Sequence, residues 1–367
     1  MAKRIFLSPP WIGARERRMM ARAFASGYVA PCGPFVDAFD RKLGDLSGQS
    51  AAAVSSGTAA LDLLMADLEV GPRTTVVASS LTFVATVGPA FHRGAKIVFV
   101  DTDPRTGTMS AEGLGRALAR TRGRTVVIAA DLYGQCSDYD ALEAVCAAAG
   151  ATLVVDAAES VGATYKGRSA GLAGAAAVYS FNGNKIITTS GGGAVLSRDP
   201  ERVARARWRA QQAREPAVWY EHREVGYNYR LSNLLGALGC AQVERLPEII
   251  RRKRALFSFY GERLAALPSR LEARPYPCAD HTASTRWLSV FLFKTQAARD
   301  TVARRLARAD IECRPVWKPL HSQPAFARCR AEGGAVAEDF FARGLCLPSG
   351  AGLTAADRRR IAEVLEG

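Results

Sequence analysis

The sequence predicts an α/β protein whose larger part is a mostly parallel, doubly wound β-sheet flanked by helices. Between about residues 50 and 200, β-branched segments alternate with segments of helical apolar spacing, and this alternation is typical of parallel sheets. The apolar runs are nearly continuous, as in strands buried on both faces. The expected strands cover residues 74–79, 95–100, 124–130, 151–156, 176–181 and 193–197.

The segments between these strands have the apolar spacing of helices. Helices are expected at residues 58–67, 84–92, 110–119 and 139–150. Short helical connections between consecutive strands place the strands in one sheet with right-handed crossovers.

The texture of the chain changes after a long amphipathic helix expected at about residues 247–267. Three strand-like segments follow, RLEARPYP, TRWLSVFLF and IECRPVWKPL, with helices expected at 297–309 and 354–365. This order is that of an α+β unit, and 367 residues exceed one typical domain. We therefore expect an N-terminal segment and large domain at 1–245, and a small C-terminal α+β domain at 246–367.

The composition is that of a globular protein, with 48% hydrophobic and 23% charged residues. No apolar run approaches the roughly 20 residues that span a bilayer. The N-terminal MAKRIFLSPPWIG is too short in its apolar part and too rich in proline for a signal peptide, so we expect a cytoplasmic protein. Eight cysteines without a CxxC spacing, and four dispersed histidines, predict no metal site and reduced thiols.

The formal net charge of +14 rests on 49 basic residues, of which only eight are lysines. So strong a bias to arginine indicates codon usage as much as a selected surface. The densest run, Arg251 to Arg254, lies in the long predicted helix, where charge runs are mostly solvated faces. We expect no nucleic-acid partner, whereas a basic cleft would suit an anionic small substrate such as a nucleotide diphosphate.

Lys185 is the most informative residue of the chain. It lies in YSFNGNKIITTSGGG, after an apolar run and before three glycines, and is poorly placed for packing. A lysine amine forms a Schiff base in its neutral form, which partial burial favours. Pyridoxal phosphate (PLP) needs such a lysine, a carboxylate facing its pyridine nitrogen and a phosphate-binding cup.

Two segments could supply the cup and the carboxylate. SSGTAAL (residues 55–61) follows a strand end and opens a helix, so its amides and Thr58 could bind a phosphate; an ordinary N-capped helix explains it equally well. Asp156 ends the apolar strand of LVVDAAES, where sheets of this class present functional groups. Capping of the next helix competes with that role.

Two further segments could complete the site. Phe83 in LTFVAT could stack on a flat ring, although most such aromatics belong to the core. Ser180 could donate to the phosphate, and the glycines at 191–193 could allow close backbone approach; a plain turn is the alternative for the glycines. The order of cup, aromatic, acid and lysine is more specific than any one segment.

The chain resembles the DegT/DnrJ/EryC1/StrS family of PLP-dependent sugar aminotransferases, which have the fold type I architecture of aspartate aminotransferase. The resemblance runs from end to end. It is carried by SSGTAAL, LTFVAT, SFNGNKIITTSGGG, SGYVAPCGPFVDAFD (26–40), DLYGQCSDYDAL (131–142), DAAESVGATYKG (156–167), GYNYRLSNLLGALGCAQ (226–242) and RPVWKPLHSQPAF (314–326).

The resemblance implies roles for the cofactor site. Lys185 would be the Schiff-base lysine and the acid–base of the reaction, Asp156 would pair with the pyridinium, and Phe83 would cover the ring. Glu159 stands where the family often has glutamine, which meets the phenolic oxygen of the ring; either the carboxyl is protonated or its contact differs. The residues implied in binding the phosphate are Gly57, Thr58 and Ser180.

Further roles are implied beyond the cofactor. Asn228 lies in a loop that in the family contacts the phosphate of the neighbouring subunit, which implies a homodimer with shared active sites. Arg230 in the same loop would contact substrate, and Trp317, Lys318 and His321 would border a nucleotide-sugar. Packing is an equal interpretation for Trp317.

The sequences of the lysine segment and of WKPLH are most similar to those of the family branch that aminates C4 of UDP-linked 4-keto-6-deoxy-N-acetylhexosamines. In that branch glutamate is the usual amino donor. An aminotransferase for a keto-cyclitol or another secondary-metabolite ketone is the alternative. A PLP-dependent sugar dehydratase would carry histidine at position 185, and a DNA-binding regulator would need a recognition motif, which the sequence lacks. The nucleotide and the stereochemistry of amination are left open by the sequence.

Overall fold

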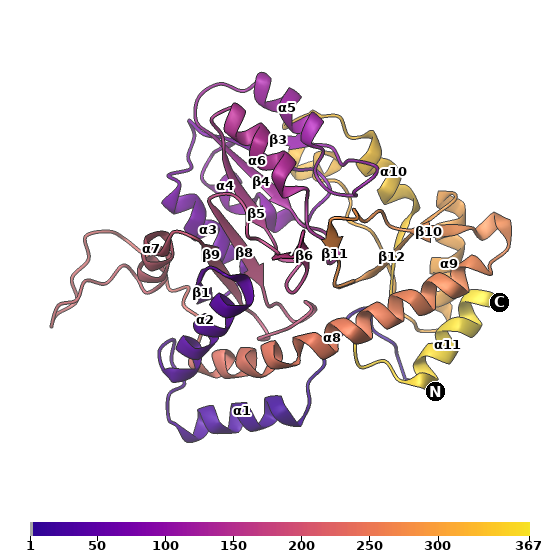
Figure 1. The fold of residues 1–367 in the computed structure, drawn as a ribbon, viewed down its shortest axis with the longest axis horizontal. Helices are drawn as coiled ribbons and strands as arrows, with labels where there is room; N and C mark the ends of the chain where they lie inside the picture. The colour runs from indigo at the N-terminus through magenta and orange to yellow at the C-terminus, as the bar shows by residue number, and fades with distance from the viewer. Residues whose placement is uncertain (1–2) are drawn as a thin grey trace.

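A computed structural model describes residues 3–367. Its largest element is an eight-stranded sheet at the left of the molecule in Figure 1. The strands in spatial order are β1 (Ser50–Val54), β9 (Gly193–Ser197), β8 (Ala176–Ser180), β5 (Thr152–Asp156), β4 (Thr125–Ala130), β2 (Thr75–Ser79), β3 (Lys96–Val100) and β14 (Arg330–Glu332).

Only β9 runs against the other seven strands of this sheet. It pairs antiparallel with both β1 and β8, whereas β8, β5, β4, β2, β3 and β14 pair in parallel. All six strands expected between residues 74 and 197 are present, and the predicted α/β class with a mostly parallel central sheet is confirmed.

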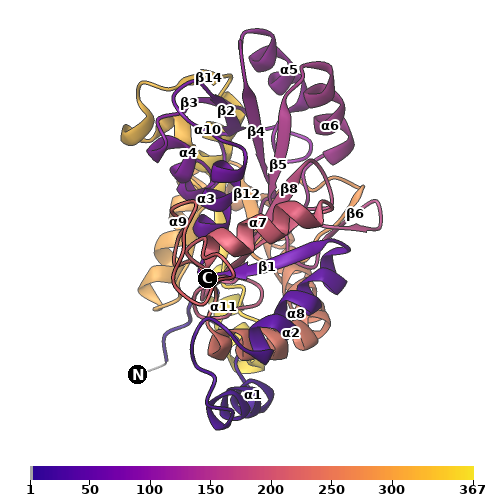
Figure 2. The same ribbon diagram turned by 90° about the vertical axis from the view of Figure 1, so that its left-hand side faces the viewer.

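Helices cover both faces of this sheet, as Figure 2 shows. In β2, Val76 packs toward the layer of α3, α4 and α7, whereas Val77 packs toward α5 and α6. At the β1 side, α2 and α8 cover that second face. The bounds of these helices are α2 (Pro34–Ser47), α3 (Gly57–Asp67), α4 (Gly88–His92), α5 (Ala111–Ala119), α6 (Tyr139–Ala148), α7 (Pro200–Ala210) and α8 (Asn233–Ala265).

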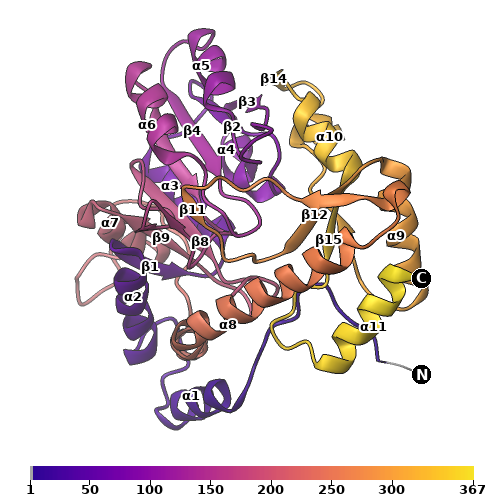
Figure 3. The same ribbon diagram turned by 45° about the vertical axis from the view of Figure 1, so that its right-hand side comes forward.

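A second, antiparallel sheet lies to the right of the first (Figure 3). Phe291 and Phe293 of its central strand pack against α9, α11 and the end of α8. Its strands and neighbouring helices are β10 (Ala273–Pro275), β12 (Ser289–Phe293), β15 (Gly344–Leu347), β13 (Arg314–Pro315), α9 (Gln296–Arg308), α10 (Ala335–Arg343) and α11 (Ala355–Glu366). A small three-stranded sheet joins β11 (Thr282–Ala283), β6 (Thr164–Tyr165) and β7 (Arg168–Ser169).

The two parts are interlocked more closely than a boundary at residues 245 and 246 implies. That position lies inside α8, which runs beneath both sheets in Figure 1. The C-terminal part returns β14 to the edge of the large sheet, and Ile5 forms a bridge with Ile311 beside the small sheet. The remaining helix, α1 (Ala14–Ala25), packs on α8.

No helix within residues 3–367 combines the length and the apolar character needed to cross a bilayer.

The important feature for function is the edge of the large sheet at which its parallel strands end. The carboxyl ends of β1, β4, β5 and β8 meet there, and they lead directly into the segments that carry the predicted site residues. Ligands of open α/β sheets bind at this edge.

Candidate active site

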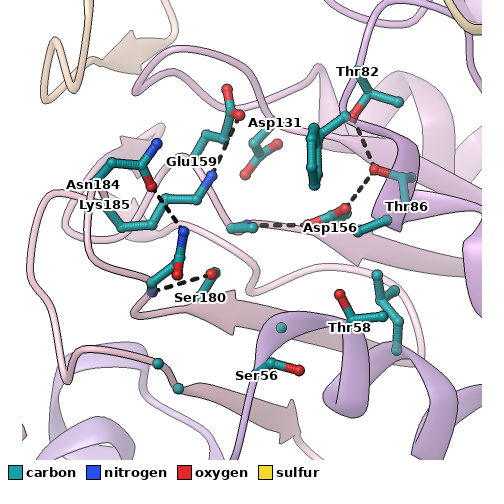
Figure 4. Close-up of a pocket in the computed structure, with 18 of the residues that line it drawn as sticks. Ser56, Thr58, Thr82, Thr86, Asp131, Asp156, Glu159, Ser180, Asn184 and Lys185 are labelled. Carbon is teal, nitrogen blue, oxygen red and sulfur yellow. Dashed lines mark hydrogen bonds and ion pairs between the residues drawn. The ribbon is translucent and has the colours of Figure 1, made fainter. Parts of the chain in front are cut away.

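A cavity of about 260 Å³ lies at this edge, and it brings together most of the predicted site residues (Figure 4). The predicted residues that line it are Gly57, Thr58, Phe83, Asp156, Glu159, Ser180, Lys185 and Trp317. They come from segments up to 260 positions apart in the chain.

Asp156 lies at the end of β5, deep in the cavity wall. Its Oδ2 accepts a hydrogen bond from the Thr86 hydroxyl at 2.7 Å, and its Oδ1 accepts one from the Ala158 N–H at 3.2 Å. Thr86 in turn pairs with Thr82 at 2.9 Å. Burial raises the pKa of the Asp156 carboxyl, an effect that these hydrogen bonds and the Lys185 charge oppose. A cation placed against this carboxyl would therefore replace the missing solvent.

The opposite end of the cavity is the N-terminus of α3. Ser56 caps the helix by accepting from the Ala59 N–H at 3.0 Å, so the capping role foreseen for this segment is real. Gly57 and Thr58 form the first turn and line the cavity beside Ser180. Positive helix ends with donors of this kind bind phosphate groups.

A glycine in β9 makes the approach of this turn possible. A Cβ on Gly193 would lie 2.4 Å from the backbone nitrogen of Gly57, and a Cβ on Gly57 would lie 3.1 Å from the Cβ of Ser180. The predicted close approach of the glycine segment is therefore to the cup itself. Only a residue without a side chain allows β9 and the cup to pack together.

Lys185 points into the cavity from the loop after β8 (Figure 4). Its ammonium lies 3.4 Å from Oε1 of Glu159, whose Oε2 accepts from the Tyr133 N–H at 3.1 Å. Burial raises the pKa of Glu159, and the nearby Asp156 raises it further, while Lys185 acts in the opposite direction. The cavity thus holds one lysine between two buried acids.

Phe83 and Trp317 form the outer wall. Phe83 is 49% exposed, and its ring centroid lies 5.3 Å from that of Trp317 at an angle of 49°. An exposed aromatic at a cavity mouth is available to a ligand, because it is not committed to the core. A flat ring held between the cup and Asp156 would lie beside Phe83.

Four predicted residues lie away from this cavity. Asn228 and Arg230 line a different one, beside Gln211 and Pro31. Lys318 is exposed, and both ring nitrogens of His321 are engaged, by the Ser80 hydroxyl and by Glu338.

The surroundings of Arg230 require a correction to its expected role as a substrate contact. Its guanidinium donates to both carboxylate oxygens of Asp40, at 3.1 and 2.9 Å, and to the Ala53 carbonyl at 2.8 Å. With 6% of its surface exposed, Arg230 anchors β1 to α2. Both of its terminal nitrogens are engaged within the chain. A motif read from the sequence does not show where a guanidinium points.

Thr86 and Asp131 are among the polar residues of the cavity that sequence reasoning did not single out. The Thr86 hydroxyl donates to Asp156. Asp131 comes directly after the end of β4, and Asp156 likewise stands at the end of β5. The same strand-end signal could have found Asp131. Its carboxylate accepts from Tyr139 and Ser160, and burial raises its pKa to about 7 against these hydrogen bonds.

No group of three or more potential metal-ligating side chains occurs among residues 3–367. The polar groups instead match an organic cofactor with a phosphate at one end, a basic ring nitrogen at the other and a carbonyl beside a lysine. The cup, Asp156 and Lys185 provide these three partners in one cavity. Fold and site together define the class of PLP-dependent enzymes.

Comparison with known proteins agrees with this class. The model of the DegT/DnrJ/EryC1/StrS aminotransferase family matches residues 10–366. EpsN of Bacillus subtilis, named as a pyridoxal phosphate-dependent aminotransferase, is 44% identical over 374 residues, covering 100% of this chain and 96% of EpsN. The GDP-perosamine synthase of Caulobacter vibrioides is 34% identical, covering 99% of this chain and 98% of the synthase. The chain belongs to the DegT/DnrJ/EryC1/StrS aminotransferase family.

Solved structures show the same architecture. The aminotransferase TlmJ from Streptoalloteichus hindustanus superposes with a TM-score of 0.91 at 28% identity, covering 99% of this chain and 98% of TlmJ. The protein is thus a PLP-dependent sugar aminotransferase, and its cofactor is pyridoxal phosphate.

Proposed function

We propose that the protein transfers an amino group from L-glutamate to C4 of a nucleotide-linked 4-keto-6-deoxyhexose, with a UDP-linked N-acetylhexosamine as the first candidate. The observation that carries the proposal is the placement of Lys185 between a phosphate cup and a buried Asp156 in one cavity. The relatives named for a substrate, GDP-perosamine synthases and a dTDP-4-dehydro-trideoxyglucose 4-aminotransferase, support a nucleotide-sugar. We place this activity in the cytoplasm.

The residues of the cavity divide the work. Gly57, Thr58 and Ser180 hold the phosphate and fix the position of the cofactor. Asp156, oriented by Thr86, would hold the ring nitrogen in its protonated form. Bound in this way, PLP supplies an electron sink for the carbon that gains or loses the amino group.

Lys185 acts as both the attachment point and the proton carrier. Its Nζ would hold the aldehyde of the cofactor and, as a free amine, would be the group of this chain placed to take up and return a proton in the cavity. Glu159, at 3.4 Å, receives the ammonium in its free form. Phe83 and Trp317 cover the ring and reduce the access of water.

We further propose a homodimer in which Asn228 completes the active site of the partner. Asn228 lies outside the cavity that contains Lys185 of its own chain. The segment before it, residues 215–225, extends from the body beyond α7 in Figure 1. Its tip exposes Val218 (98%), Trp219 (65%) and Tyr220 (77%), and such an apolar surface is typical of an interface.

Visible absorption tests the cofactor assignment. The wild type is expected to take up PLP and absorb visible light through Lys185, whereas Lys185→Ala does not. The control Lys96→Ala changes an exposed lysine at the start of β3 and keeps the absorption. A wild type that remains colourless with added PLP contradicts the proposal.

Turnover then tests the substrate. We expect glutamate-dependent conversion of a UDP-linked 4-keto-6-deoxy-N-acetylhexosamine, measured as formation of the amino sugar. The GDP- and dTDP-linked 4-keto sugars are assayed separately for comparison. Preference for a GDP or dTDP sugar would overturn the choice of nucleotide. Turnover of keto-cyclitols alone would overturn the sugar assignment.

Hybrid dimers test the shared site. A Lys185→Ala subunit and an Asn228→Ala subunit together form one site with Lys185 from the second chain and Asn228 from the first. We expect that site to bind PLP with wild-type affinity, although Asn228→Ala homodimers bind it weakly. If Asn228 acts within its own chain, no hybrid site recovers.

A further inference from the structure

Trp287 contacts the Lys185 ammonium and the carbonyl of the preceding residue, although it comes from the C-terminal part of the chain. The ring centroid of Trp287 lies 4.2 Å from the Lys185 ammonium. Its indole N–H donates to the Asn184 carbonyl at 2.8 Å, so the same side chain also holds the peptide that precedes the lysine. Trp287 comes just before β12 in the C-terminal part and is 1% exposed.

The backbone of Trp287 and the carbonyl that its indole binds are both held by neighbouring residues. Lys253 of α8, which is buried, donates to the Trp287 carbonyl at 2.9 Å and to the Ser349 carbonyl at 2.6 Å. Gly134 packs so closely that a Cβ there would lie 2.6 Å from the Trp287 nitrogen. The Ser8 hydroxyl donates to the same Asn184 carbonyl at 3.0 Å. These contacts fix the backbone at Trp287 and the carbonyl that its indole N–H binds.

An aminotransferase cycle requires a place for a free lysine. During one half of the reaction the cofactor carries the amino group, and the lysine is released as an amine that takes a proton. Glu159 alone, at 3.4 Å, is a loose partner for an ammonium with only 12% of its side chain exposed. An aromatic face at about 4 Å stabilises a desolvated cation by its quadrupole.

We propose that the face of Trp287, together with Glu159, is the resting site of the Lys185 ammonium, and that Trp287 is a positioning residue for the catalytic lysine. The inference rests on the proposed role of Lys185. In this site the ammonium is held by an aromatic face and a carboxylate oxygen of its own chain. Because Trp287 lies two residues before β12, this contact also links the antiparallel sheet to the lysine.

Lysine labelling in the cofactor-free protein tests the site directly. Trace acetylation at pH 7.5, read by mass spectrometry, gives the rate for Lys185 relative to the exposed Lys96. Trp287→Leu is expected to raise this ratio about tenfold, since the loss of a cation–π contact to a desolvated ammonium weakens its resting site by about that factor. Trp287→Phe, which keeps a weaker aromatic face, is expected to raise it about threefold.

The matched control is Trp11→Leu, which removes a tryptophan that packs on Arg245 at 3.8 Å and leaves the Lys185 ratio unchanged. A ratio for both Trp287 variants within twofold of wild type would show that the indole is only a core residue. If Trp287→Leu fails to fold by circular dichroism, the phenylalanine variant decides the question alone. Failure of the wild type to take up PLP would contradict the proposed function, whereas the labelling ratio tests the resting site independently.

Discussion

Replacing Arg230 by methionine separates a structural role from a substrate contact. The guanidinium makes two hydrogen bonds to Asp40 and one to the Ala53 carbonyl, and both charged side chains are less than 10% exposed. Breaking a buried pair by removing one partner costs about 3–5 kcal/mol. Because Arg207 still donates to Asp40 at 2.9 Å, we expect a loss near the lower limit, about 3 kcal/mol of the free energy of unfolding.

A urea titration of the cofactor-free protein, with the protein concentration held fixed, measures this loss. The double variant Asp40→Asn, Arg230→Met is expected to be less destabilised than the sum of the single variants by at least about 1 kcal/mol, since the residues share one network. The control Arg168→Met removes a surface arginine that pairs with Asp140 and should cost less than about 1 kcal/mol. A wild-type urea midpoint for Arg230→Met, combined with a raised KM for the keto-sugar, would refute the structural role.

Three further experiments, with four substitutions between them, test other parts of the molecule. Asp156→Asn should weaken PLP affinity at least roughly tenfold, because a buried charge partner is lost, and Thr86→Val less; titration followed by absorbance measures both, and equal losses would contradict the orienting role of Thr86. Gly193→Ala should displace the cup from the Gly57 nitrogen, which lies 2.4 Å from the added Cβ, and weaken inorganic phosphate binding in the cofactor-free protein; unchanged phosphate affinity would count against the cup. Burial lowers the pKa of Lys253 to about 7, so the unfolded chain binds more protons above that pH and stability should rise by about 2 kcal/mol from pH 7 to 8.5. Lys253→Met should remove this rise in urea unfolding under reducing conditions, and an identical slope in both proteins would disprove it.

The strands that sequence predicted best are those buried on both faces. β2, β3, β4, β5 and β8 begin or end within one residue of the expected bounds, because their valine and isoleucine runs require a buried setting. β1 was expected only as a strand end before SSGTAAL, without bounds, since SAAAV lacks β-branched residues until its end. β14 was missed, because an edge strand of sequence RAE has no apolar signal. Both owe their conformation to the sheet they join.

The same contrast holds for the site. Asp156 and the cup could be predicted because a strand end followed by a helix start is a local pattern that fixes where a side chain lies. Trp287 could not, because it reaches Asn184 from 103 positions away and only the packing of two sheets brings them together. Arg230 shows the opposite case, in which a local motif is recognisable but the direction of its side chain is set by Asp40 in another helix.

The continuity of α8 limits how this enzyme can be divided or moved. A helix of 33 residues is about 50 Å long, and its two halves carry residues of both cores, with Pro247 between them. No exposed linker separates the halves at residue 246, so proteolysis should not release them as folded fragments, and exchange of C-terminal parts between relatives would have to cut through a packed helix. The point inside α8 that lacks a backbone N–H is Pro247, so a closure over substrate that bends this helix would be centred there rather than at an exposed linker.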